Sequence, residues 1–157
     1  MRALLQRVRR AAVRVSSAPG RDTAATDEVF GEIGPGMVVL LGVGVDDTAD
    51  AARILAGRVA HLRIFADDSG RMNRSILDSG GQILSVSQFT LYADTGGGRR
   101  PSFVLAAQPD AAEPLYREFN RALEALGIRV VVGRFRTHMI VEIHNDGPVT
   151  ILLDSPS

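Results

Sequence analysis

The sequence predicts an α+β fold (α/β in some schemes) with about eight strands and two main helices. Short apolar runs rich in β-branched residues alternate with clusters of turn residues. Two longer segments instead repeat apolar residues every third or fourth position, as amphipathic helices do. No repeat and no linker-like tract divides the 157 residues. We therefore expect a single domain in which at least one helix covers a curved sheet.

The strand predictions rest on alternating positions or on continuous apolar runs. The chain begins with a predicted strand over residues 3–15. Residues 37–45 form a continuous apolar run directly after the turn sequence Gly34-Pro35-Gly36, which is typical of a strand buried on both faces. Further strands are predicted at residues 82–87, 128–132, 139–144 and 149–153.

Each of the two helix predictions includes an N-terminal signal. The first helix covers about residues 48–61 and follows Asp46, Asp47 and Thr48, which offer capping side chains. The second helix starts near residue 109, where Asp110 and Glu113 have the spacing of a capping box. Its apolar face is predicted to comprise Leu115, Phe119, Ala122, Leu123 and Leu126, and Gly127 suits its C-terminus.

Three segments rich in Gly, Ser, Asp and Pro are predicted to be loops: residues 16–28, 67–81 and 93–102. The first would form the tip of an enlarged hairpin on the surface. None of these segments is long enough to act as a linker. Residues 1–157 are therefore expected to fold as one domain.

Composition excludes several classes of protein. The chain has no Cys, so no disulfide framework, thiolate nucleophile or Cys-based zinc site is available. No apolar run reaches the roughly 18–20 residues of a membrane span, and the first residues do not form a secretory signal. A cytoplasmic protein is expected. The net charge of zero argues against a general DNA-binding or nucleic-acid-binding protein, although residues 1–14 hold five Arg and no acid.

The ionisable residues form no specific catalytic constellation. His138 and His144 are six residues apart, a spacing that admits a metal pair but also suits an ordinary polar surface. The pairs Asp46–Asp47 and Asp67–Asp68 lie in turn-like contexts, where caps and turns are their more frequent role. We therefore predict no metal and no cofactor.

Two polar segments interrupt the apolar pattern. Residues 87–91 (SQFTL) place two hydroxyls and an amide beside an aromatic ring, which fits either a strand end or a site. Residues 145–150 (NDGPVT) lie between two apolar runs and could be a simple hairpin turn. Their Gly-Pro bond could also be cis, at a cost of only about 0.5–1 kcal/mol.

These segments carry a resemblance to a known family. SQFTLYADT (87–95), RRPSF (99–103), GRF (133–135), Met139 and NDGPVT (145–150) occur in the order found in the D-aminoacyl-tRNA deacylases (D-tyrosyl-tRNA deacylases). The opening MRALLQRV and the stretches at 31–43 and 71–90 are also similar, so the resemblance covers almost the whole chain. It implies the fold of that family, with curved sheets in a barrel-like core.

The resemblance implies an enzyme that hydrolyses the ester of D-aminoacyl-tRNA, with mischarged glycyl-tRNA as a further substrate in some members. It implies a homodimer with its active sites at the subunit interface. A cis Gly147-Pro148 pair would enter the partner's site and exclude L-amino acids, which amounts to chiral proofreading. The partner would be the aminoacylated 3′ end of tRNA, and no metal or cofactor would be needed.

The resemblance also implies roles for individual residues. The main-chain N–H groups of Phe89 and Thr90 would stabilise the oxyanion. The Thr90 hydroxyl could act as nucleophile, but we favour activation of water by the substrate 2′-OH, because the motif offers Thr90 no base. The implied catalytic residues are Ser87, Gln88, Phe89 and Thr90, and the implied substrate-binding residues are Gly147, Pro148, Arg7, Asn145, Thr150 and Met139.

The sequence departs from the family pattern at two places. Residues 16–28 are longer than the usual loop, and Arg136-Thr137-His138 replaces small residues before Met139. The latter change puts the details of an adenosine pocket in doubt. Arg99 and Arg100 are either tRNA backbone contacts or solvated loop arginines. Two alternatives remain open: a non-catalytic tRNA 3′-end binding protein of this fold, and a metallohydrolase that uses His138 and His144.

Overall fold

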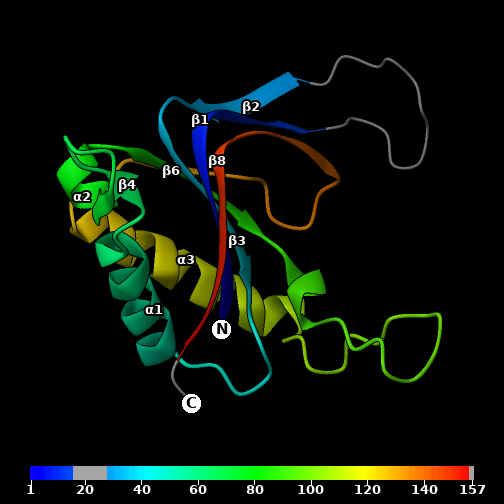
Figure 1. The fold of residues 1–157 in the computed structure, drawn as a ribbon. Helices are drawn as coiled ribbons and strands as arrows, with labels where there is room; N and C mark the ends of the chain where they lie inside the picture. Colours follow the sequence, from blue (N-terminus) through cyan, green and yellow to red (C-terminus); the bar gives the residue numbers. More distant parts are fainter. Residues whose placement is uncertain (16–27, 156–157) are drawn as a thin grey trace.

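A computed structural model describes residues 1–15 and 28–155 of the chain. Its centre is a mixed six-stranded sheet, nearly closed into a barrel, in the order β2-β1-β3-β6-β7, with β8 paired to the other side of β1 (Figure 1). The strands of this sheet are β1 (Arg2–Val15), β2 (Glu28–Ile33), β3 (Gly36–Gly42), β6 (Gln82–Ser87), β7 (Val130–Val132) and β8 (Met139–Asp154). The architecture is the predicted α+β class.

β1 is the strand on which the sheet is built. One edge of β1 pairs antiparallel with β3 near its start and with β2 near its end, while the other edge pairs with β8 along almost its whole length. β3 and β6 then run parallel, so the sheet is mixed. Burial of β3 on both faces is confirmed, since Met37, Val38, Val39 and Leu41 have no exposed surface. This burial explains its continuous apolar run.

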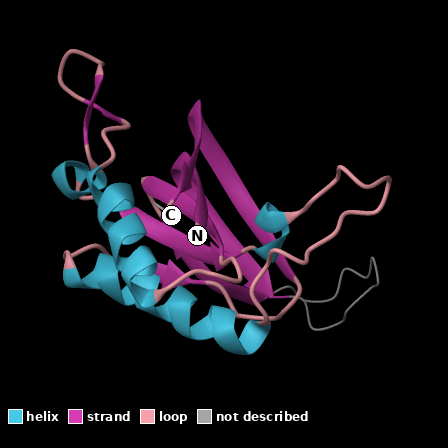
Figure 2. Cartoon of the chain, turned by 90° about the horizontal axis from the view of Figure 1, so that it is seen from below, coloured by secondary structure: helices cyan, strands magenta, loops and turns pink. Residues whose placement is uncertain are grey.

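Two helices cover one face of the sheet: α1 (Ala49–His61) and α3 (Pro109–Ala125) (Figure 2). They pack against each other and bury Leu55, Phe119 and Leu123 in the main core. The side chain of Thr48 caps α1 by accepting a hydrogen bond of 3.2 Å from the N–H of Ala51, as predicted. No helix in the described residues is long and apolar enough to cross a membrane.

The predicted cap of the second helix is wrong. Gln108 is the N-cap residue of α3 and makes no side-chain capping bond, while Asp110 lies inside the first turn. Pro109 occupies the first helical position, where its fixed φ favours a helix start and its missing N–H costs little. The prediction for the other end is confirmed, since Gly127 follows the helix with φ +86°.

The prediction of a continuous loop over residues 67–81 is also wrong. It contains β5 (Met72–Arg74), which pairs with β4 (Phe65–Ala66) in a small hairpin, and the one-turn helix α2 (Ile76–Ser79). A reciprocal capping box between Ser75 and Asp78 starts α2. Such short elements contain too few apolar residues to give a periodic signal.

The largest correction concerns the end of the chain, where one long strand replaces the two predicted strands. β8 pairs with β1 before and after residues 146–149: Asn145 lies opposite Val8, and Thr150 lies opposite Gln6. Five residue steps on β8 therefore face two on β1, so residues 146–149 loop out of the ladder. The hairpin-turn interpretation is wrong, because the strand continues in the same direction.

The predicted surface loop at residues 16–28 lies outside the described residues, except for Glu28, where β2 begins. β1 and β2, which precede and follow this segment in the sequence, pair antiparallel.

Candidate active site

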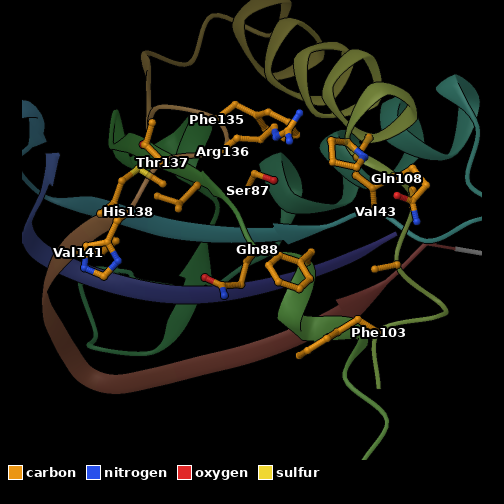
Figure 3. Close-up of a pocket in the computed structure, with 17 residues that line it drawn as sticks. Val43, Ser87, Gln88, Phe103, Gln108, Phe135, Arg136, Thr137, His138 and Val141 are labelled. Carbon is orange, nitrogen blue, oxygen red and sulfur yellow. The ribbon is translucent and has the colours of Figure 1, made fainter. Parts of the chain in front are cut away.

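A cavity of about 690 Å³ opens at the end of β6 (Figure 3). Its walls come from that strand end, the segment before α3, the start of α3 and the loop that joins β7 to β8. Figure 3 shows Ser87 and Gln88 between the loop residues Thr137 and His138 on one side and Val43 and Gln108 on the other. The lining residues are Val43, Val86–Phe89, Phe103, Ala106–Pro109, Ala112, Phe135–Met139 and Val141.

The predicted motif SQFT forms one wall of this cavity. Ser87 and Gln88 are half-buried, whereas the Phe89 ring is 56% exposed and meets Phe103 edge-on at 4.9 Å between ring centroids. The 3₁₀ helix η1 (Phe89–Tyr92) begins directly after Gln88. Its first hydrogen bond runs from Leu91 N to Gln88 O. The N–H groups of Phe89 and Thr90 precede that bond, so η1 leaves both donors free of intrahelical partners.

Thr90 lies next to the cavity and is not among its lining residues. Its hydroxyl accepts a hydrogen bond from the side-chain amide of Gln88. No carboxylate or imidazole of the described residues contacts this hydroxyl. The described residues therefore offer the Thr90 hydroxyl no side-chain base.

The loop between β7 and β8 forms the opposite wall. Gly133 begins this loop, and a Cβ atom there would come within 3.0 Å of the Met139 sulfur. The Thr137 hydroxyl donates a 2.8 Å bond to the carbonyl of Arg134. Arg136 has φ +58°. The larger side chains at 136–138 thus line the cavity, and the backbone there is tightly turned.

Tyr116 contacts both β6 and the loop between β7 and β8, and it was missed by the sequence interpretation. Its hydroxyl donates a 2.8 Å bond to the carbonyl of Ser85, and its ring lies 6.1 Å from that of Phe135. Burial raises the pKa of Tyr116, so the hydroxyl remains a neutral donor. Phe103 and Gln108 were also missed. The apolar face of α3 could have indicated Tyr116 as a core residue, and Phe103 ends the RRPSF motif of the resemblance, but no sequence signal pointed to Gln108.

The Gly147–Pro148 peptide bond is cis, the isomer that the resemblance implies. Both residues are exposed, and Gly147 has φ +121°, a region that L side chains rarely adopt. Arg7 contacts the loop from β1: its Nε donates to the carbonyl of Asp146 at 3.2 Å, and its Nη1 donates to the carbonyl of Ile64 at 2.6 Å. Arg7 thus links the loop to the segment after α1.

Asn145 and Thr150 bond to each other across the base of the same loop. The Asn145 side-chain amide donates to the Thr150 hydroxyl at 2.9 Å, and its oxygen accepts from the N–H of Val149 at 3.3 Å. Gln6 on β1 donates to the same hydroxyl at 3.3 Å. These bonds close the base of the loop.

The structure divides the predicted site residues into two groups. Ser87, Gln88, Phe89 and Met139 line the cavity, with Thr90 beside it. The residues of the second group surround the looped-out segment of β8 and do not line the cavity: Arg7, Asn145, Gly147, Pro148 and Thr150. Within the described chain the two groups remain apart.

The histidines do not form a metal centre with other ligands. No group of three His, Asp or Glu side chains in the described residues could hold a metal ion. His138 precedes β8 and lines the cavity, whereas His144 lies within β8 opposite Arg10.

The acidic pairs act in turns, as predicted. Asp47 accepts a 2.6 Å bond from the N–H of Gly44. Hydrogen bonds from Ser69, Arg71 and Asn73 lower the pKa of Asp67 to about 2.

Comparison with solved structures defines the class of fold. The chain superposes over its full length on a structure titled "c-Myc DNA Unwinding Element Binding Protein", with TM-score 0.88, 38% identity and complete coverage of both chains. A structure described as a probable eukaryotic D-amino acid tRNA deacylase gives TM-score 0.80 at 20% identity and covers 98% of each chain.

Comparison with protein families and curated relatives then gives the family. Residues 4–154 match the family model described as D-Tyr-tRNA(Tyr) deacylase. A D-aminoacyl-tRNA deacylase of Symbiobacterium thermophilum is 57% identical over 155 residues, which is 99% of this chain and 96% of the relative. One of Deinococcus radiodurans is 55% identical over 154 residues, covering 98% and 99%. The chain belongs to the D-aminoacyl-tRNA deacylase family.

Proposed function

We propose that the protein hydrolyses the ester bond of D-aminoacyl-tRNA and releases the free D-amino acid and tRNA. The observation that carries this proposal is the pair of main-chain N–H groups of Phe89 and Thr90, which open η1 at the wall of the cavity. Family membership and relatives of more than 50% identity with that name support it. Glycyl-tRNA that has been mischarged is a second proposed substrate, and the proposed site of action is the cytoplasm.

The proposed chemistry needs a positioned water and donors for the developing oxyanion. An aminoacyl ester is already activated, so a strong side-chain nucleophile is unnecessary. One well-placed donor contributes roughly 10²–10³ in rate. Ser87 and Gln88 would shape the site around the terminal adenosine, with Met139 on the facing wall. The substrate 2′-OH would help to activate the water, since the described residues place no base beside Thr90.

The proposed chiral filter is the looped-out Gly147-Pro148 segment of a second subunit. Its exposure, and its position outside the cavity of its own chain, support delivery across a homodimer interface. Carbonyl groups of the loop would hold the substrate α-amino group, and an L side chain would collide with the loop. Arg7 would fix the loop through Asp146, while Asn145 and Thr150 would close its base. Specificity would then come from excluding the wrong enantiomer.

The test compares the hydrolysis of D-tyrosyl-tRNA and L-tyrosyl-tRNA by the purified protein, with and without a chelator. We expect rapid release of D-tyrosine, slow release of L-tyrosine and no effect of the chelator. Equal release of the two enantiomers would contradict the filter. Binding of the tRNA end without turnover would instead favour the non-catalytic alternative. Sedimentation analysis tests the homodimer, and a monomer with full activity would contradict delivery of the loop by a partner.

A further inference from the structure

The side chains that line the cavity include a cationic group and no anionic group. Among its lining residues there is no carboxylate, and Arg136 is the one arginine. The other polar lining groups are the neutral side chains Ser87, Gln88, Gln108 and Thr137, together with His138. Three phenylalanines also line it, and aromatic rings of this kind can stack on a nucleobase. This combination suits a ligand that has both an aromatic base and a negative charge.

Arg136 is one of the described arginines whose guanidinium has no partner, and among these it is the one that lines the cavity. Arg7, Arg9, Arg53, Arg74 and Arg117 each pair with a carboxylate. The guanidinium of Arg136 makes no ion pair and no hydrogen bond with any described residue. It is exposed at the edge of the cavity, so its five donors are available to a ligand.

The backbone of Arg136 is also unusual. Among the described residues, Arg136 is the only non-glycine residue with a positive φ, which is +58°. This left-handed conformation is favourable for glycine and unfavourable for a residue with a side chain, such as arginine. The neighbouring bond from the Thr137 hydroxyl to the Arg134 carbonyl holds the turn. A long cationic side chain therefore stands at a position where the backbone conformation favours glycine.

We propose that Arg136 binds the phosphate on the 5′ side of the terminal nucleotide of the tRNA substrate. This inference rests on the proposed function. When the ester carbonyl lies at the N–H groups of Phe89 and Thr90 and the base lies among the aromatic rings, the 5′ phosphate is the charged part of the terminal nucleotide. The planar guanidinium matches two phosphate oxygens at once. Arg136 is thus a substrate-binding residue that distinguishes a nucleotide from an aminoacyl adenosine without a phosphate.

The experiment compares two small substrates that lack the rest of the tRNA. One is the D-tyrosyl ester of adenosine, and the other is the same ester of adenosine 5′-methyl phosphate, which has a single negative charge like the tRNA backbone. Hydrolysis rates give kcat/KM for each with the wild-type protein. We expect the phosphate-bearing ester to be preferred about 10- to 100-fold, the range for hydrogen bonds to a charged group.

Three variants test whether that preference comes from the Arg136 side chain. Arg136→Gly removes the guanidinium and suits the left-handed backbone, so it should fold at least as well as the wild type. It should hydrolyse both esters with equal kcat/KM, and its loss on the phosphate-bearing ester should lie mainly in KM. Arg134→Ala removes an exposed arginine of the same loop that does not line the cavity, and it should keep the preference. Arg136→Lys should retain part of the preference, since it keeps the charge without the planar fork.

Equal hydrolysis of the two esters by the wild type, or a preference that survives in Arg136→Gly, would overturn the proposal. D-tyrosyl-tRNA is measured in parallel. If the wild type hydrolyses D-tyrosyl-tRNA but does not distinguish the two esters, only the phosphate contact is wrong. If the wild type does not hydrolyse D-tyrosyl-tRNA, the proposed function itself is wrong.

Discussion

The hydroxyl of Tyr116 and the carbonyl oxygen of Ser85 are joined by a 2.8 Å hydrogen bond that links α3 to β6. The N–H of Gly133 donates to the same oxygen at 2.9 Å. One atom therefore joins the helix, the strand that ends in SQFT and the loop that forms the facing wall. The spacing of the two walls of the cavity depends on this junction.

Tyr116→Phe should lower the free energy of unfolding by about 1 kcal/mol, because a buried neutral hydrogen bond is lost while the Ser85 carbonyl keeps its bond from Gly133. Urea unfolding measures this change. Tyr92→Phe is the matched control. The Tyr92 hydroxyl makes a longer bond of 3.3 Å to the Asp47 carboxylate, which also accepts a hydrogen bond from the N–H of Gly44. An effect of Tyr92→Phe that equals or exceeds that of Tyr116→Phe would contradict the prediction.

Stability should fall as the pH rises above about 10. Burial raises the pKa of Tyr116 above its ordinary value of 10.0, and burial with the neighbouring Asp47 raises that of Tyr92. The unfolded chain then loses these protons before the folded chain does, so the free energy of unfolding falls as the pH rises from the unfolded pKa toward the folded one. Because the chain has no Lys and no Cys, its two tyrosines are its only side chains that titrate near pH 10.

Unfolding in urea at pH 8 to 11 measures this dependence. The slope should be shallower in Tyr116→Phe, which leaves Tyr92 as the single titrating side chain in that range. A stability that stays constant up to pH 11 would contradict the raised pKa values.

Gly36→Ala should destabilise the fold by about 3 kcal/mol or more, since overpacking at this site meets rigid backbone. A Cβ atom at Gly36 would lie 1.9 Å from the carbonyl oxygen of Gln82, where β3 and β6 pair. Gly34→Ala, two residues earlier in the same turn, meets nothing within 4 Å and should change stability by less than about 0.5 kcal/mol. Thermal unfolding of both variants tests the contrast, and similar melting temperatures would argue against the close approach.

Arg7→Ala should reduce kcat/KM for D-tyrosyl-tRNA by about 10- to 100-fold, because it removes two charge-assisted bonds that hold the Gly147-Pro148 loop. Arg9→Ala provides the comparison. Arg9 bonds to the carboxylate of the same residue, Asp146, but its side chain is 83% exposed, so its removal should cost little. The D/L ratio of hydrolysis rates should fall in Arg7→Ala. An unchanged ratio would mean that the loop does not need this clamp.

Thr90→Ala should keep activity within about tenfold of the wild type if main-chain donors carry the oxyanion, because the substitution leaves both N–H groups in place. Single-turnover hydrolysis of D-tyrosyl-tRNA measures the chemical step directly. Gln88→Ala is a useful companion, since it removes the one side-chain donor to the Thr90 hydroxyl. Complete loss of activity in a folded Thr90→Ala protein would favour the nucleophile mechanism instead.

Most of the fold was predictable because its long elements have strong periodic signals. The continuous apolar run of β3, the Thr48 cap of α1 and the glycine after α3 all agree with the structure. Short elements were missed, since the hairpin β4–β5 and the one-turn helix α2 depend on local hydrogen bonds and not on a repeating apolar face. The segment SQFTL stood out as a polar interruption and the resemblance gave it a role, but the sequence could not indicate that Phe103 and Gln108 share its cavity.

By itself, the sequence determined the class of fold and the two segments that interrupt the apolar pattern, because burial imposes a residue period that can be read directly. Only the tertiary structure decided that NDGPVT loops out of one continuous strand, since strand pairing depends on β1, which is distant along the chain. The structure also placed Arg136 in the cavity lining and joined the Tyr116 hydroxyl to the Ser85 carbonyl. Such contacts join residues that only folding brings together, so no local pattern encodes them.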